Sequence, residues 1–156
     1  MKKKLLGLAL LGAMMATLLV GCGSSGGKKG DTKDDVITIG FSQVGAESDW
    51  RTANSESMKS TFSEKNGYKL IFDDAQQKQE NQLKAIRNFI QQEVDYIVLA
   101  PVTESGWDAV LKEAKDADIP VIIVDRMVDV SDDSLYTAWV GSNFKLEGQK
   151  ACAWLK

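Results

Sequence analysis

The chain from Val36 onward alternates short, unbroken apolar runs with longer segments of helical periodicity. Runs such as 97–99 (IVL) and 121–124 (VIIV) lack polar alternation, which is typical of parallel strands covered on both faces. The intervening segments place apolar residues along one side of a helix: Leu83, Ile86 and Ile90, and then Trp107, Val110, Leu111 and Ala114. This alternation predicts an open, doubly wound parallel α/β sheet.

The same periodicities predict the bounds of each element. We expect strands at 36–41, 68–72, 95–100, 120–125 and 135–140, and helices at 53–65, 78–92, 105–117 and 143–156. Gly67 is placed to end a helical region, Pro120 to open a strand, and Asn143 to cap the last helix. The folded domain is therefore expected to begin near Val36 in the sequence.

The N-terminus has the organisation of an export signal. Three lysines precede an uncharged apolar run of 16 residues, 5–20, which is shorter than the roughly 20 residues that a spanning helix needs. The residues 19–22 (LVGC) resemble a bacterial lipobox, which implies lipid attachment to Cys22 and cleavage before it. We therefore expect a lipoprotein signal peptide at 1–21 and a flexible, Gly- and Ser-rich tether at 22–35.

Composition excludes several classes of function. Three of the 19 Lys and Arg residues and none of the 22 Asp and Glu residues lie in 1–21, so the net charge falls from −3 to −6 on cleavage, which disfavours nucleic acid as a partner. The absence of histidine excludes Ser-His and Cys-His nucleophiles and histidine-ligated zinc. With Cys22 lipidated, Cys152 is alone and is expected to be a small buried hydrophobe, with neither a disulfide nor a metal site.

Ligands of doubly wound sheets bind beyond the carboxyl ends of the strands. The segments expected there are 42–51, 73–77, 101–105 and 125–126, which together offer an indole, two guanidinium groups, carboxylates and amides. No GxGxxG motif follows the first strand, so a dinucleotide is disfavoured and no cofactor is expected.

This inventory suits a sugar, which presents an apolar C–H face and a ring of hydroxyls. Trp50 could stack on that face, Asp125 could accept from hydroxyls, and either Arg51 or Arg126 could donate to others. Taken singly, Trp50 could equally be a packing residue at a helix start, Glu47 and Asp49 ordinary helix N-terminal carboxylates, and 125–126 a solvated turn. Four polar segments at one sheet edge favour the sugar site.

Four segments carry a resemblance to a known family: 36–54 (VITIGFSQVGAESDWRTAN), 73–102 (DDAQQKQENQLKAIRNFIQQEVDYIVLAPV), 106–126 (GWDAVLKEAKDADIPVIIVDR) and 140–149 (VGSNFKLEGQ). They resemble the type I periplasmic sugar-binding proteins of ABC importers, and 43–51 (QVGAESDWR) and 76–82 (QQKQENQ) look like a galactofuranose-binding subgroup. The resemblance implies a flavodoxin-like N-terminal lobe that captures a monosaccharide for a membrane permease. The expected ligand-binding residues are Glu47, Trp50, Arg51, Gln77, Asp125 and Arg126.

Members of that family are about twice as long and close two lobes over the ligand. We therefore interpret 36–142 as the N-terminal lobe and 143–156 as the start of a second lobe that is missing, so that the chain is an N-terminal fragment carrying half the site. A full-length parent is expected to be monomeric and lipid-anchored, at the periplasmic face or the cell surface.

Two other functions remain open at this point. A sugar sensor presenting its ligand to a chemoreceptor would have the same binding loops. A glycosidase could use two of the carboxylates Glu47, Asp49, Asp73, Asp74 and Asp125. The nearby arginines disfavour the enzyme because they would lower carboxyl pKa values, whereas a general acid needs its pKa raised. We expect a binding protein without catalytic residues.

Overall fold

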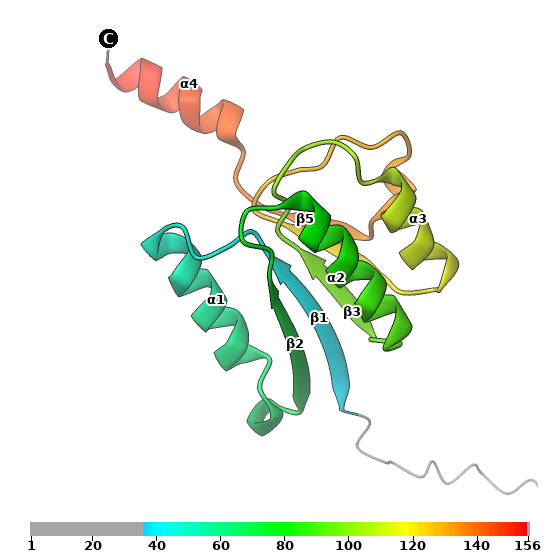
Figure 1. Cartoon of the computed structure of the whole chain (residues 1–156). Coiled ribbons are helices and arrows are strands. Elements are labelled where there is room, and N and C mark those ends of the chain that lie inside the picture. The colour runs from blue at the N-terminus through cyan, green and yellow to red at the C-terminus, as the bar shows by residue number, and fades with distance from the viewer. Residues whose placement is uncertain (1–35, 156) are drawn as a thin grey trace, which may run out of the picture. The chain divides into compact units, whose positions relative to one another are not determined.

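The computed structural model describes residues 36–155, which form a five-stranded parallel sheet with helices on both faces (Figure 1). The strands are β1 (Ile37–Gln43), β2 (Tyr68–Asp74), β3 (Tyr96–Leu99), β4 (Val121–Val124) and β5 (Ala138–Val140); the helices are α1 (Asp49–Thr61), α2 (Gln79–Gln91), α3 (Asp108–Asp116) and α4 (Phe144–Trp154), with 3-10 turns at Glu64–Asn66 and Asp133–Leu135. The strand order is β2-β1-β3-β4-β5. The prediction of a doubly wound parallel sheet is confirmed, and its order reverses between β1 and β3.

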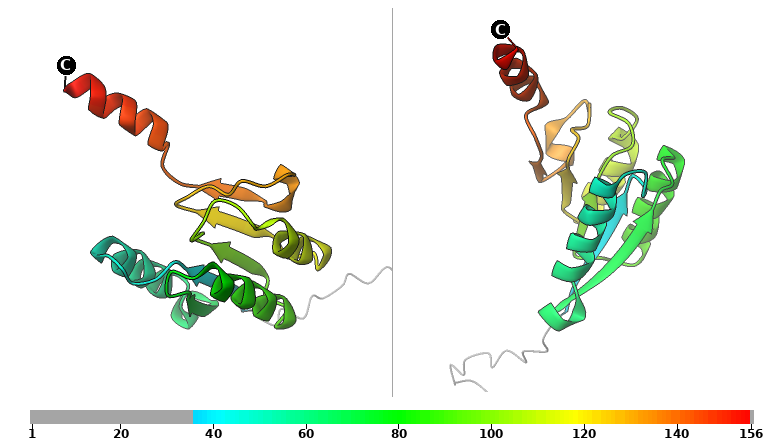
Figure 2. Two further views of the ribbon diagram at one scale, coloured as in Figure 1. Left: turned by 45° about the horizontal axis from the view of Figure 1, so that its top comes forward. Right: turned by 90° about the vertical axis from the view of Figure 1, so that its left-hand side faces the viewer.

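Two apolar clusters hold the helices to the sheet. Residues of α2 and α3 pack on one face, around Phe89, Trp107 and Leu111, and α1 covers part of the other face (Figure 2). Gly40 lies under α2, where an added Cβ would stand 2.4 Å from Cγ of Phe89, so only glycine lets the helix approach β1 this closely.

Several bounds differ from the prediction, and the differences reposition site residues. The helix expected at 53–65 begins at Asp49, because the Ser48 side chain accepts a hydrogen bond from the Arg51 backbone N–H and caps it. β1 and β2 each run two residues further than expected, pairing Gln43 with Asp74. Asp73 and Asp74 are therefore strand residues rather than loop residues.

The helix expected at 105–117 begins at Asp108, because Gly106 turns the chain with a φ of +90°. The strand expected at 135–140 is confined to β5, because Leu135 belongs to the preceding 3-10 turn. Gly67, with a φ of +85°, ends the earlier 3-10 turn as expected.

α4 begins as predicted, since the Asn143 side chain accepts a hydrogen bond from the Leu146 backbone N–H. None of its residues is buried. The prediction that Cys152 is buried is wrong, because within the described chain no element packs over α4. No helix among residues 36–155 is both long and apolar enough to cross a membrane. The predicted signal peptide, Cys22 and the tether lie outside the described residues.

Candidate ligand-binding site at the carboxyl edge of the sheet

The strands are all parallel, so their carboxyl ends meet at one edge, and hydrogen bonds join the segments that follow them. The Gln77 backbone N–H donates to Val44 at 2.7 Å, and the Gln79 side chain donates to the Ser105 carbonyl at 2.7 Å. Arg126 Nη1 donates to the Val102 carbonyl at 3.3 Å. The predicted convergence of these segments is confirmed.

Arg51 is the centre of the site. It comes from the first turn of α1, and its side chain is only 4% exposed. Its Nη2 donates to Oδ2 of Asp125 at 2.7 Å, and its Nε donates to Oε1 of Glu47 at 3.1 Å. One buried guanidinium therefore joins the segment after β1 to the segment after β4, on either side of β3.

Asp125 follows β4 directly and adopts a left-handed backbone with a φ of +67°. Its N–H donates to the Val140 carbonyl at 2.9 Å, and its carbonyl accepts from the Trp139 indole N–H at 3.3 Å. A Cβ on Gly141 would stand 2.2 Å from the Asp125 carbonyl oxygen. β5 thus holds this strained residue in place, and a glycine is needed for the close approach.

Trp50 and Arg126 are the accessible groups of the site. Trp50 is 55% exposed, and Cζ of Arg51 lies 4.9 Å from its ring centroid, in a cation–π contact. The Arg126 side chain is about half exposed, and its Nε lies 4.0 Å from Oδ2 of Asp125. Arg126, rather than the buried Arg51, has the more accessible N–H groups.

Gln77 lies beside this cluster rather than in it. It is exposed, has a φ of +62°, and contacts the segment after β1, where a Cβ on Gly45 would lie 3.4 Å from Cγ of Gln77 and 3.1 Å from Oε2 of Glu47. Asp49 is exposed in the first turn of α1. The structure therefore brings together Glu47, Trp50, Arg51, Asp125 and Arg126, with Gln77 at the rim.

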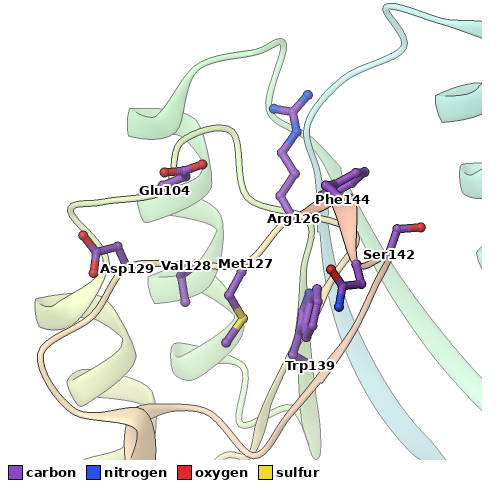
Figure 3. A pocket seen from close by; sticks show the side chains of 9 residues that line it. Glu104, Arg126, Met127, Val128, Asp129, Trp139, Ser142 and Phe144 are labelled. Atoms are coloured by element: carbon purple, nitrogen blue, oxygen red, sulfur yellow. The ribbon is translucent and has the colours of Figure 1, made fainter. Parts of the chain in front are cut away.

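A cavity of about 720 Å³ adjoins Arg126 (Figure 3). Its walls come from the segment after β3, the segment after β4, β5 and the start of α4: Glu104, Arg126, Met127, Val128, Asp129, Trp139, Ser142, Asn143 and Phe144. Sequence reasoning treated Trp139 only as part of a strand. Its partial exposure follows from the position of β5 at the edge of the sheet.

Two fully buried glutamines support the site and were also missed. The side-chain oxygen of Gln43 contacts the Arg51 guanidinium. The side chain of Gln82 donates to the carbonyl of Ala100 at 2.7 Å and accepts from the Val102 N–H at 2.8 Å. Gln82 had a detectable signal, because it shares the buried face of α2 with Ile86, four residues later.

The charges of the cluster balance. Arg51 and Arg126 oppose Glu47 and Asp125, with no net charge among the four. Among residues 36–155 no group of three or more Cys, Asp or Glu side chains is placed to hold a metal ion. These paired charges lie beside the exposed indole of Trp50 and next to a cavity whose wall also carries Glu104 and Asp129.

The strand order of this parallel sheet reverses beside a polar site, and that site is built from the segments that follow several strands. This arrangement defines a ligand-binding α/β lobe. The chain belongs to the family described as periplasmic binding protein domain, whose model matches residues 39–156. Its fold is that of the N-terminal lobe of type I periplasmic binding proteins.

The relatives of the chain are sugar-binding proteins. Over 119 residues it is 54% identical to the galactofuranose-binding protein YtfQ of Escherichia coli (strain K12), covering 76% of this chain and 37% of that protein. Over 132 residues it is 38% identical to the fructose import binding protein FruE of Bifidobacterium longum (strain NCC 2705), covering 84% of this chain and 39% of that protein.

Among solved structures, this chain is similar to the periplasmic binding protein component of the arabinose ABC transporter from Shewanella sp. ANA-3, bound to α- and β-L-arabinofuranose. The two chains are 58% identical, and the TM-score is 0.72. The match covers 76% of this chain and 39% of that one. The chain thus spans about 40% of the length of these relatives.

Proposed function

We propose that this chain carries the sugar-binding surface of a substrate-binding lipoprotein, which captures a neutral, galactofuranose-like monosaccharide for a carbohydrate ABC permease. The names of its relatives, which include galactofuranose- and arabinofuranose-binding proteins, support this ligand class. The observation that carries the proposal is the charge-balanced cluster around Arg51, with the exposed Trp50 beside it.

Each residue of the cluster has a role that sugar chemistry requires. The hydrogen bonds within residues 36–155 engage Oδ2 of Asp125, which leaves Oδ1 to accept from a hydroxyl. Arg126 is accessible as a donor, and the open surface of Trp50 can stack on the C–H face of the ring. Glu47 and Gln77 complete the polar rim. A ligand without hydroxyls would leave these groups unpaired, which is the physical basis of the expected selectivity.

The remaining parts of the chain fit a tethered binding protein. In this proposal residues 1–21 direct export, Cys22 carries the lipid, and 22–35 hold the lobe 36–142 away from the membrane, at the periplasmic face or the cell surface. Residues 143–156 begin a second lobe, which agrees with the absence of buried residues in α4.

The positions of the carboxyl groups give little support to the hypothesis that the protein is a glycosidase. Burial raises the pKa of Asp73, and the neighbouring Asp74 raises it further, which is the direction a general acid needs. However, Asp73 lines a different, smaller pocket with Asn81, Lys84 and Asn88, away from the Arg51 cluster. We infer a binding protein rather than an enzyme.

The test is an NMR titration of this chain without residues 1–22, using D-galactose, L-arabinose and methyl furanosides of both sugars. Because the described surface encloses the ligand only in part, we expect affinity of roughly millimolar order. The Trp50 indole N–H and the amides of Asp125 and Arg126 should shift, and Trp50→Ala should abolish the response. Lys112→Ala, on the exposed side of α3, is the control. No shift with any sugar at tens of millimolar, or an unchanged response in Trp50→Ala, would contradict the proposal.

A further inference from the structure

Gln43, the last residue of β1, has a side-chain amide whose hydrogen-bonding capacity is fully used. Its Nε2 donates to Oδ1 of Asn54 at 2.8 Å and to Oγ of Ser55 at 3.2 Å. Its Oε1 accepts from the Val44 backbone N–H at 3.0 Å and from Nη1 of Arg51 at 3.4 Å. The residue is 0% exposed, so water cannot replace any of these partners.

These partners allow only one orientation of the amide. Turning it over would point its NH₂ group at the Val44 N–H and at a guanidinium, so that donors would face donors. The same turn would take the Nε2 donor away from Asn54 and Ser55. The oxygen of Gln43 is therefore fixed toward Arg51 by the strand and by α1 together.

We infer that Gln43 is a positioning residue, which orients the Arg51 guanidinium so that its Nη2 faces Asp125. The 3.4 Å contact is long for a hydrogen bond, so it contributes little to the stability of the fold. The proposed directing effect comes from the fixed orientation of the Gln43 amide, whose other three partners hold its oxygen toward Arg51. The two carboxylate partners of Arg51, Glu47 and Asp125, are 27% and 19% exposed, whereas Gln43 is completely buried. Ser55 reinforces the arrangement by donating its hydroxyl to the Arg51 carbonyl at 2.9 Å.

The consequence for binding rests on the proposed function. A guanidinium that is already aligned keeps Asp125 in place before the sugar arrives, so less side-chain freedom is lost on binding. Without Gln43, Arg51 would gain rotamers in which its bonds to Glu47 and Asp125 are open for part of the time. The open oxygen of Asp125 would then no longer be held in one direction.

Gln82 provides a matched control. It is also a glutamine, also 0% exposed, and also hydrogen-bonded to backbone groups at the carboxyl edge of the sheet, but it has no bond to Arg51. A loss of stability alone should therefore be similar in Gln43→Met and Gln82→Met, whereas an effect on the Arg51 side chain should appear only in Gln43→Met.

The experiment measures the exchange with water, and the ¹⁵N relaxation, of the Arg51 Nε–H group in this chain without residues 1–22 and without sugar. We expect Hε exchange to accelerate roughly tenfold or more in Gln43→Met, and to change less than about twofold in Gln82→Met. Gln43→Glu loses the donor to Asn54 and Ser55 but places a carboxylate oxygen toward Arg51, and the resulting ion pair should restore slow exchange. It also serves if Gln43→Met does not fold. Equal acceleration in both methionine variants, or slow exchange in Gln43→Met, would overturn the inference.

A second measurement separates this inference from the proposed function. Sugar affinity is measured for the parent chain and for Gln43→Met by the titration described above, and we expect roughly tenfold weaker binding in Gln43→Met. If the parent chain binds no sugar, the proposed function fails, but the exchange of the Arg51 Nε–H still decides the role of Gln43.

Discussion

Replacing Asp125 with asparagine tests whether the Arg51–Asp125 ion pair contributes as much to the free energy of unfolding as a buried ion pair does. In Asp125→Asn, the Arg51 guanidinium, only 4% exposed, keeps Glu47 as its one carboxylate partner. Breaking a fully buried pair costs about 3–5 kcal/mol, because one charge is left without compensation. Since Arg51 keeps its bond to Glu47 and the Asp125 side chain is 19% exposed to water, the cost is smaller here, and we expect the free energy of unfolding to fall by about 2–3 kcal/mol.

The assay is urea unfolding followed by circular dichroism, in which a loss of this size lowers the midpoint by about 2 M. The control is Glu113→Gln. Glu113 accepts two hydrogen bonds from Arg87, each at 2.8 Å, but both side chains are more than 40% exposed, so water and salt screen the pair. Its midpoint should stay within experimental error.

A double variant, Arg51→Met with Asp125→Asn, completes the cycle. The double variant removes the cation and one of its two carboxylates, which leaves Glu47 as the single remaining charge, and that side chain is 27% exposed to water. The double variant should therefore cost less than the sum of the two single variants. The reasoning is refuted if Glu113→Gln costs as much as Asp125→Asn, or if the effects of Arg51→Met and Asp125→Asn simply add.

Three further predictions concern packing, pH and exposure. Gly40→Ala should destabilise the fold by about 1–3 kcal/mol, because its Cβ would stand 2.4 Å from the Phe89 ring, and adding Phe89→Leu should recover part of the loss in urea unfolding. The raised pKa of Asp73 means that the folded chain holds this proton more tightly than the unfolded chain, so stability falls as pH rises above the ordinary pKa of 3.8. Asp73→Asn should therefore be more stable than the parent at about pH 7, and the difference should be gone near about pH 3. An equal difference at both pH values would be inconsistent with the raised pKa. Cys152 is exposed and should react with a maleimide in the folded chain as fast as in urea, so protection without denaturant would mean that α4 is covered.

Much of the fold followed from local pattern. Unbroken apolar runs predicted the parallel strands, and the helical stripes predicted which residues would face the sheet, including Val110, Leu111 and Ala114, which are all 0% exposed. Cap chemistry predicted the start of α4 at Asn143. These features depend on neighbours within about one helical turn or on short continuous apolar runs, both of which are readable from a single sequence.

The positions of polar residues near the strand ends were harder to predict. Ser48 could equally have been a loop residue, so the start of α1 was placed four residues late. The burial of Cys152 was wrong, because a small apolar residue in a helical pattern says nothing about whether another element covers it.

The sequence by itself determined the class of sheet. It also predicted that a ligand binds at the carboxyl edge, through Glu47, Trp50, Arg51, Gln77, Asp125 and Arg126. Only the tertiary structure decided which of the two arginines is buried, which remains accessible, and that the Gln43 side chain lies against the buried one. The physical reason is that Arg51 and Asp125 are 74 residues apart in the chain and meet only because the strand order places β3 between their segments. Pairing across a sheet depends on that order, which local periodicity does not encode.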